Sequence, residues 1–481
     1  MPKSKLDEAA VAFATIAELK TALRNREISS VELTKMLSRR MERIGPEYNA
    51  LACSLAKDGH KTAKDADDDL KHERFRGPLQ GIPYAVKDLI AVAKHPTTWG
   101  AKPYADQVFD YNATVINRLR KEQAILIGKL SMVELAGGGG YSSASASLQG
   151  PGLNPWNKQY WSGGSSSGSG AAVAAGLVPY ALGSETSGSI MTPACYCGVT
   201  GLRPTYGLVS RHGAMALSWT LDKIGVLARS AEDCGLVLHA IAGGDDQDPG
   251  SSGKSFWYTP QYGVDFRDLR VGYAEIDFAE WPDEPLRPAF QNALSVFKSI
   301  GSRMVETKLP DFPYGPVIGT IIDAEGASVF EPLIRSGKVD QLADQSQIDG
   351  LKASLTYLAT DYLKAMRVRS QIRAAFRDLF LQMDVLIAPT KFSLPDRADI
   401  PFPETPPKRP DTKGVGAGLV QAGNLCGLPA LTVPSGYING LPIGLVVVGP
   451  PFMENAILAY GREFQNRTDF HKQHPRVLGE S

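Results

Sequence analysis

The chain has 481 residues, of which 43% are hydrophobic and 21% are charged, as is typical of a soluble globular protein. Its 51 Lys and Arg residues balance its 51 Asp and Glu residues, so the formal net charge is zero. A neutral chain offers no broad attraction to nucleic acid or an anionic membrane surface, and we expect a small-molecule partner. The first eight residues lack the apolar core of a secretory signal, and the apolar run 441–448 is too short to span a membrane. A cytoplasmic protein is therefore expected.

Cysteine and histidine spacing argues against disulfide and metal frameworks. The five cysteines are few and irregularly spaced, which fits a reducing compartment. Cys195 and Cys197 are too close together for a zinc knuckle, and the seven histidines form no His-Glu-x-x-His pair. We therefore expect neither a metal nor a cofactor.

The N-terminal third alternates helical and strand-like patterns. Residues 16–44 predict two amphipathic helices, the second with a serine N-cap at Ser29 or Ser30. Three further elements are expected here: a buried strand over 81–92, a helix over 113–122 and a strand over 124–128. This strand–helix–strand order predicts an α/β fold with a mixed or parallel sheet.

Beyond a centre rich in Gly and Ser, ordinary patterning returns. Helices are expected over 231–242, 286–300 and 351–380, and strands over 269–273, 383–388 and 431–449. The Pro-rich run 391–414 predicts a long loop. Since there is no repeat and no strongly polar linker, the simplest organisation is a single domain, 1–481. A variable insertion over about 250–414 would shape its substrate site.

The first Gly/Ser segment, 162–170, has the composition of a flexible linker. It runs, however, directly into the small apolar residues 171–177, which are typical of a tightly buried helix. Such a loop directs backbone N–H groups and the positive end of a helix dipole at one point, which suits an anion or a developing oxyanion. A phosphate-binding loop needs a Gly-Lys-Ser/Thr end, and a dinucleotide motif needs a preceding strand; neither is present.

Ser166 stands at the centre of a Gly-x-Ser-x-Gly match, the pattern of a nucleophile elbow. Asp222 and His239 follow in the order that such a triad requires, but no strand enters the segment. In a run so rich in Gly and Ser this match is expected by chance, and we discount it.

The second Gly/Ser segment, 182–190, places Ser189 in a turn after a strand-like stretch. A serine hydroxyl needs a neighbouring base, and no histidine is suitably placed. Lys87 is the candidate, because it lies in an otherwise apolar strand where burial would lower its pKa. The alternative is a lysine at the end of a strand that reaches solvent or pairs with Asp88. The strand alone leaves both alternatives open.

Three segments together resemble the amidase signature family. Residues 164–169 resemble its Gly-Gly-Ser-Ser-Gly-Gly-Ser run, 183–190 its Gly-Ser-Asp-Thr-Gly-Gly-Ser-Ile run, and 81–88 its Gly-Ile-Pro-x-x-x-Lys-Asp strand. The likeness covers nearly the whole chain except about 250–382. It implies an α/β fold with a large mixed, mostly parallel, twisted sheet covered by helices on both faces.

The resemblance also implies a role for each candidate residue. Ser189 would be the nucleophile, Ser165, held by a cis peptide bond, would relay the proton, and Lys87 would be the base. The remaining assignments are an oxyanion hole at the N–H groups of Thr186, Ser187, Gly188 and Ser189, and an acyl pocket lined by Ala136, Gly137 and Gly138.

The expected function is hydrolysis of a carboxamide or carbamate C–N bond through a serine acyl-enzyme, as in an amidase or urethanase, with ester cleavage as a side activity. The expected partner is a small-molecule amide or carbamate, with no nucleic acid and no membrane, and a homodimer is compatible with this reading. The alternative is the A subunit of a glutamyl-tRNA amidotransferase, which releases ammonia from glutamine for transfer to a charged tRNA.

Three departures from the family pattern bear on the substrate. Glu185 replaces Asp, Ser187 replaces Gly, and Met191 replaces the Arg that commonly follows Ser-Ile. The loss of this Arg weighs against glutamine as the ammonia donor.

Overall fold

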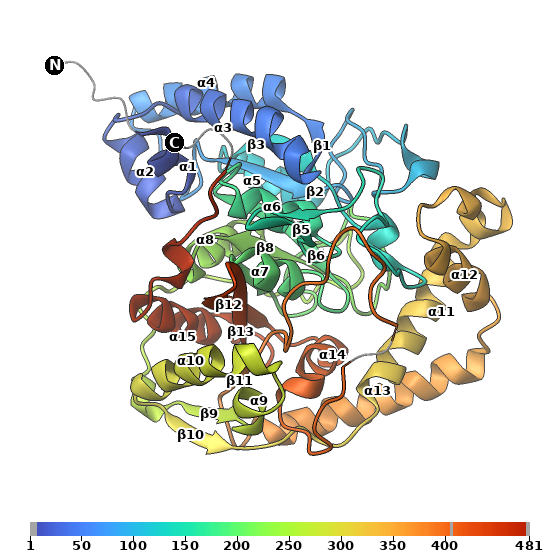
Figure 1. Ribbon diagram of the computed structural model, residues 1–481. Coiled ribbons are helices and arrows are strands. Elements are labelled where there is room, and N and C mark those ends of the chain that lie inside the picture. Colours follow the sequence, from blue (N-terminus) through green and yellow to red (C-terminus); the bar gives the residue numbers. More distant parts are fainter. Residues whose placement is uncertain (1–6, 405–406, 478–481) are drawn as a thin grey trace.

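The computed structural model describes residues 7–404 and 407–477, and eleven strands in this part of the chain form one mixed sheet (Figure 1). In spatial order they are β1 (Leu51–Ser54), β3 (Ile125–Leu130), β2 (Pro83–Lys87), β6 (Tyr180–Glu185), β8 (Lys223–Ala228), β7 (Thr200–Arg203), β12 (Ala430–Ile438), β13 (Leu441–Val448), β11 (Val385–Pro389), β9 (Arg270–Tyr273) and β10 (Arg303–Glu306). A separate two-stranded sheet consists of β4 (Leu153–Asn154) and β5 (Asn157–Trp161).

The predicted α/β fold with a mixed sheet is confirmed, but most strand pairs are antiparallel. Only β3–β2, β2–β6, β11–β9 and β9–β10 run parallel; the other six pairings of the large sheet are antiparallel. One reason is the tight turn at Asn439 and Gly440, both with positive φ, which folds the predicted strand over 431–449 into the hairpin of β12 and β13.

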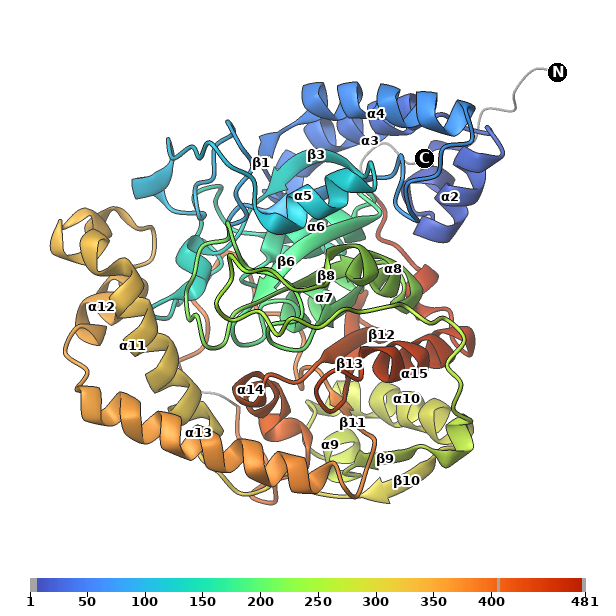
Figure 2. The ribbon, with the colours of Figure 1, turned by 180° about the vertical axis from the view of Figure 1, so that it is seen from behind.

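Helices cover the sheet on both faces (Figures 1 and 2). In chain order they are α1 (Glu8–Ala12), α2 (Ile16–Arg24), α3 (Ser30–Ile44), α4 (Ala56–Lys71), α5 (Thr114–Lys121), α6 (Ser167–Ala174), α7 (Met191–Cys197), α8 (Ala231–Ile241), α9 (Ile276–Ala279), α10 (Arg287–Ser299), α11 (Tyr314–Arg335), α12 (Gln345–Ser354), α13 (Ala359–Leu379), α14 (Gly416–Cys426) and α15 (Glu454–Asn466). Of the helices in the described ranges, none is long and apolar enough to cross a membrane.

The side chains along β12 show which helix covers each face of the sheet. Thr432 contacts Met191 of α7, whereas its neighbours Leu431 and Val433 lie against Gly461 of α15. Because successive side chains of a strand point to opposite faces, α7 and α15 lie on opposite sides of the sheet. The Gly/Ser loops that precede α6 and α7 are therefore on the same side as α7, since α6 and α7 pack together.

Several elements can be compared with the boundaries that the sequence predicted. Ser29 caps α3 and forms a capping box with Glu32, so the second predicted helix begins where the serine pair indicates. The predicted strand over 81–92 is shorter, because its pairing with β3 ends at Lys87 and the chain then turns. The segment 250–414 contributes β9, β10 and β11 to the sheet, and its helices α11, α12 and α13 lie along one side of the molecule in both views (Figures 1 and 2).

Candidate active site

Lys87 ends β2, between β3 and β6, and its side chain is completely buried. Its Nζ donates to Ser165 Oγ at 2.7 Å and to Ser184 Oγ at 3.0 Å. Asp88 does not pair with it; the Asp88 carboxylate lies 2.8 Å from Nζ of Lys129, on the neighbouring strand β3. Of the two alternatives that the strand left open, the structure therefore has the buried lysine, turned toward the serine loops.

Burial lowers the pKa of Lys87 from 10.5 to about 7, because the charged ammonium loses its hydration. The carboxylates of Asp222 and Glu185 act in the opposite direction, since each favours the charged form. About half of the Lys87 side chains are then neutral near pH 7. A neutral amine that contacts a serine hydroxyl can accept a proton from it.

Ser165 is held in a loop whose glycines leave no room for side chains. The peptide bond between Gly164 and Ser165 is cis. A Cβ atom at Gly164 would lie 2.7 Å from Trp161 and 2.8 Å from Val133. The Val133 N–H donates to the Ser165 carbonyl at 3.1 Å, which fixes the loop from the other side. The loop opens α6, a helix in which all eight residues are buried, so 162–170 is not a flexible linker.

Ser166, at the centre of the discounted elbow motif, has no histidine beside it. Its hydroxyl is buried and bonds to the backbone of Ser184, accepting from the N–H at 3.3 Å and donating to the carbonyl at 3.2 Å. His239 instead packs beside Trp257, with ring centroids 5.0 Å apart. Asp222 accepts a hydrogen bond from Thr186. The three residues of the apparent motif are thus engaged separately.

Ser189 lies in the tight turn between β6 and α7, and Gly188 adopts a positive φ of 87° there. The Ser189 carbonyl accepts the Ser166 N–H at 3.2 Å, which holds the two serine loops together. Within the described residues, the N–H groups of Ser187, Gly188 and Ser189 donate to no acceptor. Three adjacent donors in one turn are therefore available to a negatively charged oxygen.

Glu185 anchors this turn. Its Oε2 accepts the N–H groups of Ile190 at 2.8 Å and Met191 at 3.0 Å. Its Oε1 lies 2.8 Å from Arg203 Nη1 and accepts from Asn424 at 2.9 Å. Although burial opposes ionisation, the Arg203 and Lys223 cations hold the pKa of Glu185 at about 2. The departure from Asp at this position thus still supplies a carboxylate that orients the Ser189 turn.

Ser184 is the member of this cluster that sequence reasoning did not single out. It stands near the end of β6, and its hydroxyl is the second partner of Lys87. In the sequence, Ser184 is marked only by its place in the same short motif as Ser189. The pattern of a strand does not indicate which groups a serine hydroxyl contacts.

A cavity of about 340 Å³ opens onto Ser189. Aromatic and apolar side chains form much of its wall. Its lining residues are Ala136, Gly137, Tyr141, Trp161, Gly164, Thr186, Ser187, Ser189, Thr192, Leu217, Ile322, Lys391 and Phe402. Of the three predicted acyl-pocket residues, Gly138 is not among them; it packs against Leu217 and Phe330 and accepts a hydrogen bond from Gln347.

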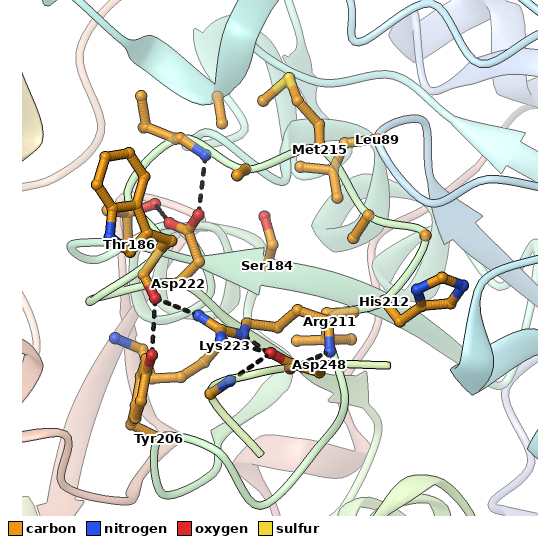
Figure 3. A pocket seen from close by; sticks show the side chains of 18 of the residues that line it. Leu89, Ser184, Thr186, Tyr206, Arg211, His212, Met215, Asp222, Lys223 and Asp248 are labelled. Carbon is orange, nitrogen blue, oxygen red and sulfur yellow. Dashed lines mark hydrogen bonds and ion pairs between the residues drawn. The ribbon is translucent and has the colours of Figure 1, made fainter. Parts of the chain in front are cut away.

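A second cavity, of about 480 Å³, adjoins the first and shares Ala136, Thr186 and Leu217 with it. Figure 3 shows Ser184 on its wall, with Asp222 on one side and the Arg211–Asp248 pair, 2.7 Å apart, on the other. The base and this cavity therefore share Ser184 as a neighbour. In the described parts of the chain, no three His, Cys, Asp or Glu side chains are grouped as metal ligands would be.

Comparisons with known proteins relate the chain to one family. The Amidase family model matches residues 32–458. The A subunit of the glutamyl-tRNA(Gln) amidotransferase of Desulforudis audaxviator is 35% identical over 96% of this chain and 97% of the relative. Two solved structures each cover 99% of both chains with a TM-score of 0.79: the peptide amidase of Stenotrophomonas maltophilia, 29% identical, and the corresponding amidotransferase protein of Thermotoga maritima, 26% identical.

These relatives contradict the predicted partners. The sequence predicted a small-molecule substrate and no nucleic acid, whereas curated relatives matching over nearly their whole length are named as one subunit of an amidotransferase for glutamyl-tRNA(Gln). The prediction was wrong because it relied on net charge. A balanced charge argues against a broadly basic nucleic-acid surface, but it does not exclude a subunit of an enzyme that acts on a tRNA.

Proposed function

Because this chain belongs to the Amidase family, we propose that it cleaves a carboxamide C–N bond through an acyl-enzyme on Ser189, with Ser165 and Lys87 as its proton-transfer partners. The observation that carries the proposal is the 2.7 Å hydrogen bond between Lys87 Nζ and Ser165 Oγ. It supplies what a serine nucleophile lacks by itself, a buried base that is partly neutral near pH 7.

In the proposed mechanism, neutral Lys87 takes the proton of Ser165 while Ser165 takes that of Ser189. Ser189 Oγ forms a bond to the acyl carbon, and the carbonyl oxygen gains a negative charge opposite the N–H groups of the turn. The proton returns through Ser165 to the nitrogen as the C–N bond breaks. Each N–H donor to the oxyanion contributes about 3 kcal/mol to the stabilisation of the transition state. Water then releases the acid from Ser189.

For the biological role, we infer an ammonia-releasing component of an amidotransferase that amidates glutamyl-tRNA, with glutamine as the ammonia donor. Support comes from the near-complete coverage of both chains at 35% identity with a protein of that name. Coverage matters because the likeness then extends beyond the serine motifs to the segments that surround the site.

Hydrolysis of an amide or carbamate to free acid and amine is the second candidate. It is favoured by Met191, which stands where the family commonly has Arg, and by the likeness to a peptide amidase at 29% identity. The same acyl-enzyme serves both candidates, since they differ only in where the nitrogen goes.

The experiment measures ammonia release by the purified chain from L-glutamine and from pentanamide, a neutral primary amide. Ser189→Ala should reduce release at least about a thousandfold, as loss of a nucleophile does. Release should be retained in the control Ser169→Ala, which changes a buried serine of α6 whose hydroxyl donates to the Leu182 carbonyl. Activity that survives in Ser189→Ala would refute the proposed nucleophile.

The two roles are then separated by adding glutamyl-tRNA and the companion chains of the amidotransferase. Glutamine-dependent amidation of the tRNA supports the first role. Release of ammonia from pentanamide by the chain alone, with no amidation of the tRNA under any condition, supports the second and rejects the first.

A further inference from the structure

Lys391 is a cation on the wall of the Ser189 cavity to which sequence analysis assigned no role. It follows β11 by two residues, and it lines the same cavity as Ser189 and Thr192. Its side chain is neither fully buried nor fully exposed. Much of the wall around it is aromatic or apolar, including Trp161 and Phe402.

Within 7–404 and 407–477, this ammonium has no counter-ion. Throughout the described residues, no carboxylate lies within 4.0 Å of Lys391 Nζ, and Nζ makes no hydrogen bond. Glu185 is near enough to influence its pKa but is already held by Arg203, and Asp396 influences it from beyond ion-pair distance. The ring centroid of Tyr196 lies 6.0 Å from Nζ, and the buried Cys195 thiol also acts on the charge of Lys391.

Contacts also connect Lys391 with the position where the family commonly has Arg. Met191 occupies that position and is buried. Thr432 Oγ1 contacts the Met191 sulfur at 3.2 Å and the Thr390 hydroxyl at 3.2 Å, and Thr390 immediately precedes Lys391. The segment adjacent to this uncharged position thus carries a positive charge, and Lys391 lines the Ser189 cavity whereas Met191 does not.

We propose that Lys391 is the residue that selects a dicarboxylic monoamide such as glutamine, its ammonium binding the carboxylate that the acyl part of such a substrate carries. The proposal rests on the proposed function, because a primary amide releases only ammonia and the cavity must then hold the acyl part. Burial lowers the pKa of Lys391 by penalising its charge, and a bound carboxylate would offset that penalty. The apolar wall would contact the methylene groups between amide and carboxylate.

Binding of reaction products tests this without turnover. Glutarate and pentanoate have the same carbon chain and differ in one terminal carboxylate. By calorimetry, the wild-type chain should bind glutarate at least about tenfold more tightly than pentanoate. Lys391→Met should weaken glutarate about 30-fold, equivalent to about 2 kcal/mol at 1.4 kcal/mol per tenfold. Lys391→Arg should keep most of the preference. Lys364→Met, an exposed lysine of α13, should leave both affinities unchanged.

Turnover separates this inference from the proposed function. In Lys391→Met, the ratio of kcat/KM for glutaramate to that for pentanamide should fall about 30-fold, matching the loss of affinity. A wild-type chain with no preference for glutarate, or a preference that survives in Lys391→Met, overturns the inference even if Ser189-dependent amide cleavage is observed. Conversely, glutarate binding that depends on Lys391 without cleavage of either amide supports the inference and refutes the proposed function.

Discussion

The pH dependence of amide cleavage follows directly from the burial of Lys87. Only the neutral amine can accept a proton, and the pKa of about 7 sets the fraction that is neutral. That fraction is about one tenth at pH 6, one half at pH 7 and nine tenths at pH 8. We therefore expect kcat/KM for pentanamide, which does not itself titrate, to rise tenfold per pH unit below about pH 6.5 and to level off above about pH 8.

The measurement is kcat/KM from pH 5.5 to 9.5 at constant ionic strength, because this parameter reports groups of the free enzyme. Samples returned to pH 7.5 after exposure to each pH control for acid or alkaline damage. A lysine with its ordinary pKa of 10.5 would still give a tenfold rise between pH 8.5 and 9.5. A rise of that kind, with no plateau, would refute the reasoning that a desolvated Lys87 is the base.

Two substitutions test the contacts around the base and the turn. Ser184→Ala removes the hydroxyl that lies 3.0 Å from the Lys87 amine and should lower kcat/KM about tenfold to a hundredfold. KM should change little, because Ser184 does not line the Ser189 cavity. The matched Ser169→Ala should differ little from wild type. Equal losses in both variants would contradict a specific role. Glu185→Gln leaves Arg203 buried without its counter-ion and should lower the free energy of unfolding by about 3 kcal/mol in urea titrations, whereas Glu331→Gln, in an exposed pair, should cost under about 1 kcal/mol. Similar values for the two would show that the buried pair contributes no more than a surface one.

The Gly/Ser loops were predictable because their chemistry is local. Ser165 and Ser189 lie in short motifs whose glycines are required by the backbone itself, as the positive φ at Gly188 shows. The surrounding α/β pattern was also predictable, because apolar residues recur every 2 residues in a strand and about every 3.6 residues in a helix. Strand direction was not, because it depends on which strands become neighbours after folding.

Side chains that act through tertiary contacts were beyond sequence reasoning. The sequence left the role of Lys87 open because Asp88 could have paired with it. Asp88 pairs instead with Lys129, which belongs to a strand more than forty positions later in the chain. Lys391 was assigned only to a Pro-rich loop, and nothing in that loop's composition indicates which cavity its first residue faces. The roles of both lysines depend on which distant segments lie together after folding, and the spacing of residues within one segment does not predict that.

The ion pair between Lys129 and Asp88 lies next to Lys87, the base whose pKa is lowered. Two completely buried lysines stand on neighbouring strands, and the nearest carboxylate in sequence neutralises only one of them. The carboxylates that raise the pKa of Lys87 are those of Asp222 and Glu185, whereas the Asp88 carboxylate is engaged by Lys129. We therefore expect a Lys129→Met chain, in which Asp88 has lost its counter-ion, to need more alkaline conditions to reach the same activity, because an unpaired carboxylate next to Lys87 would favour the protonated amine.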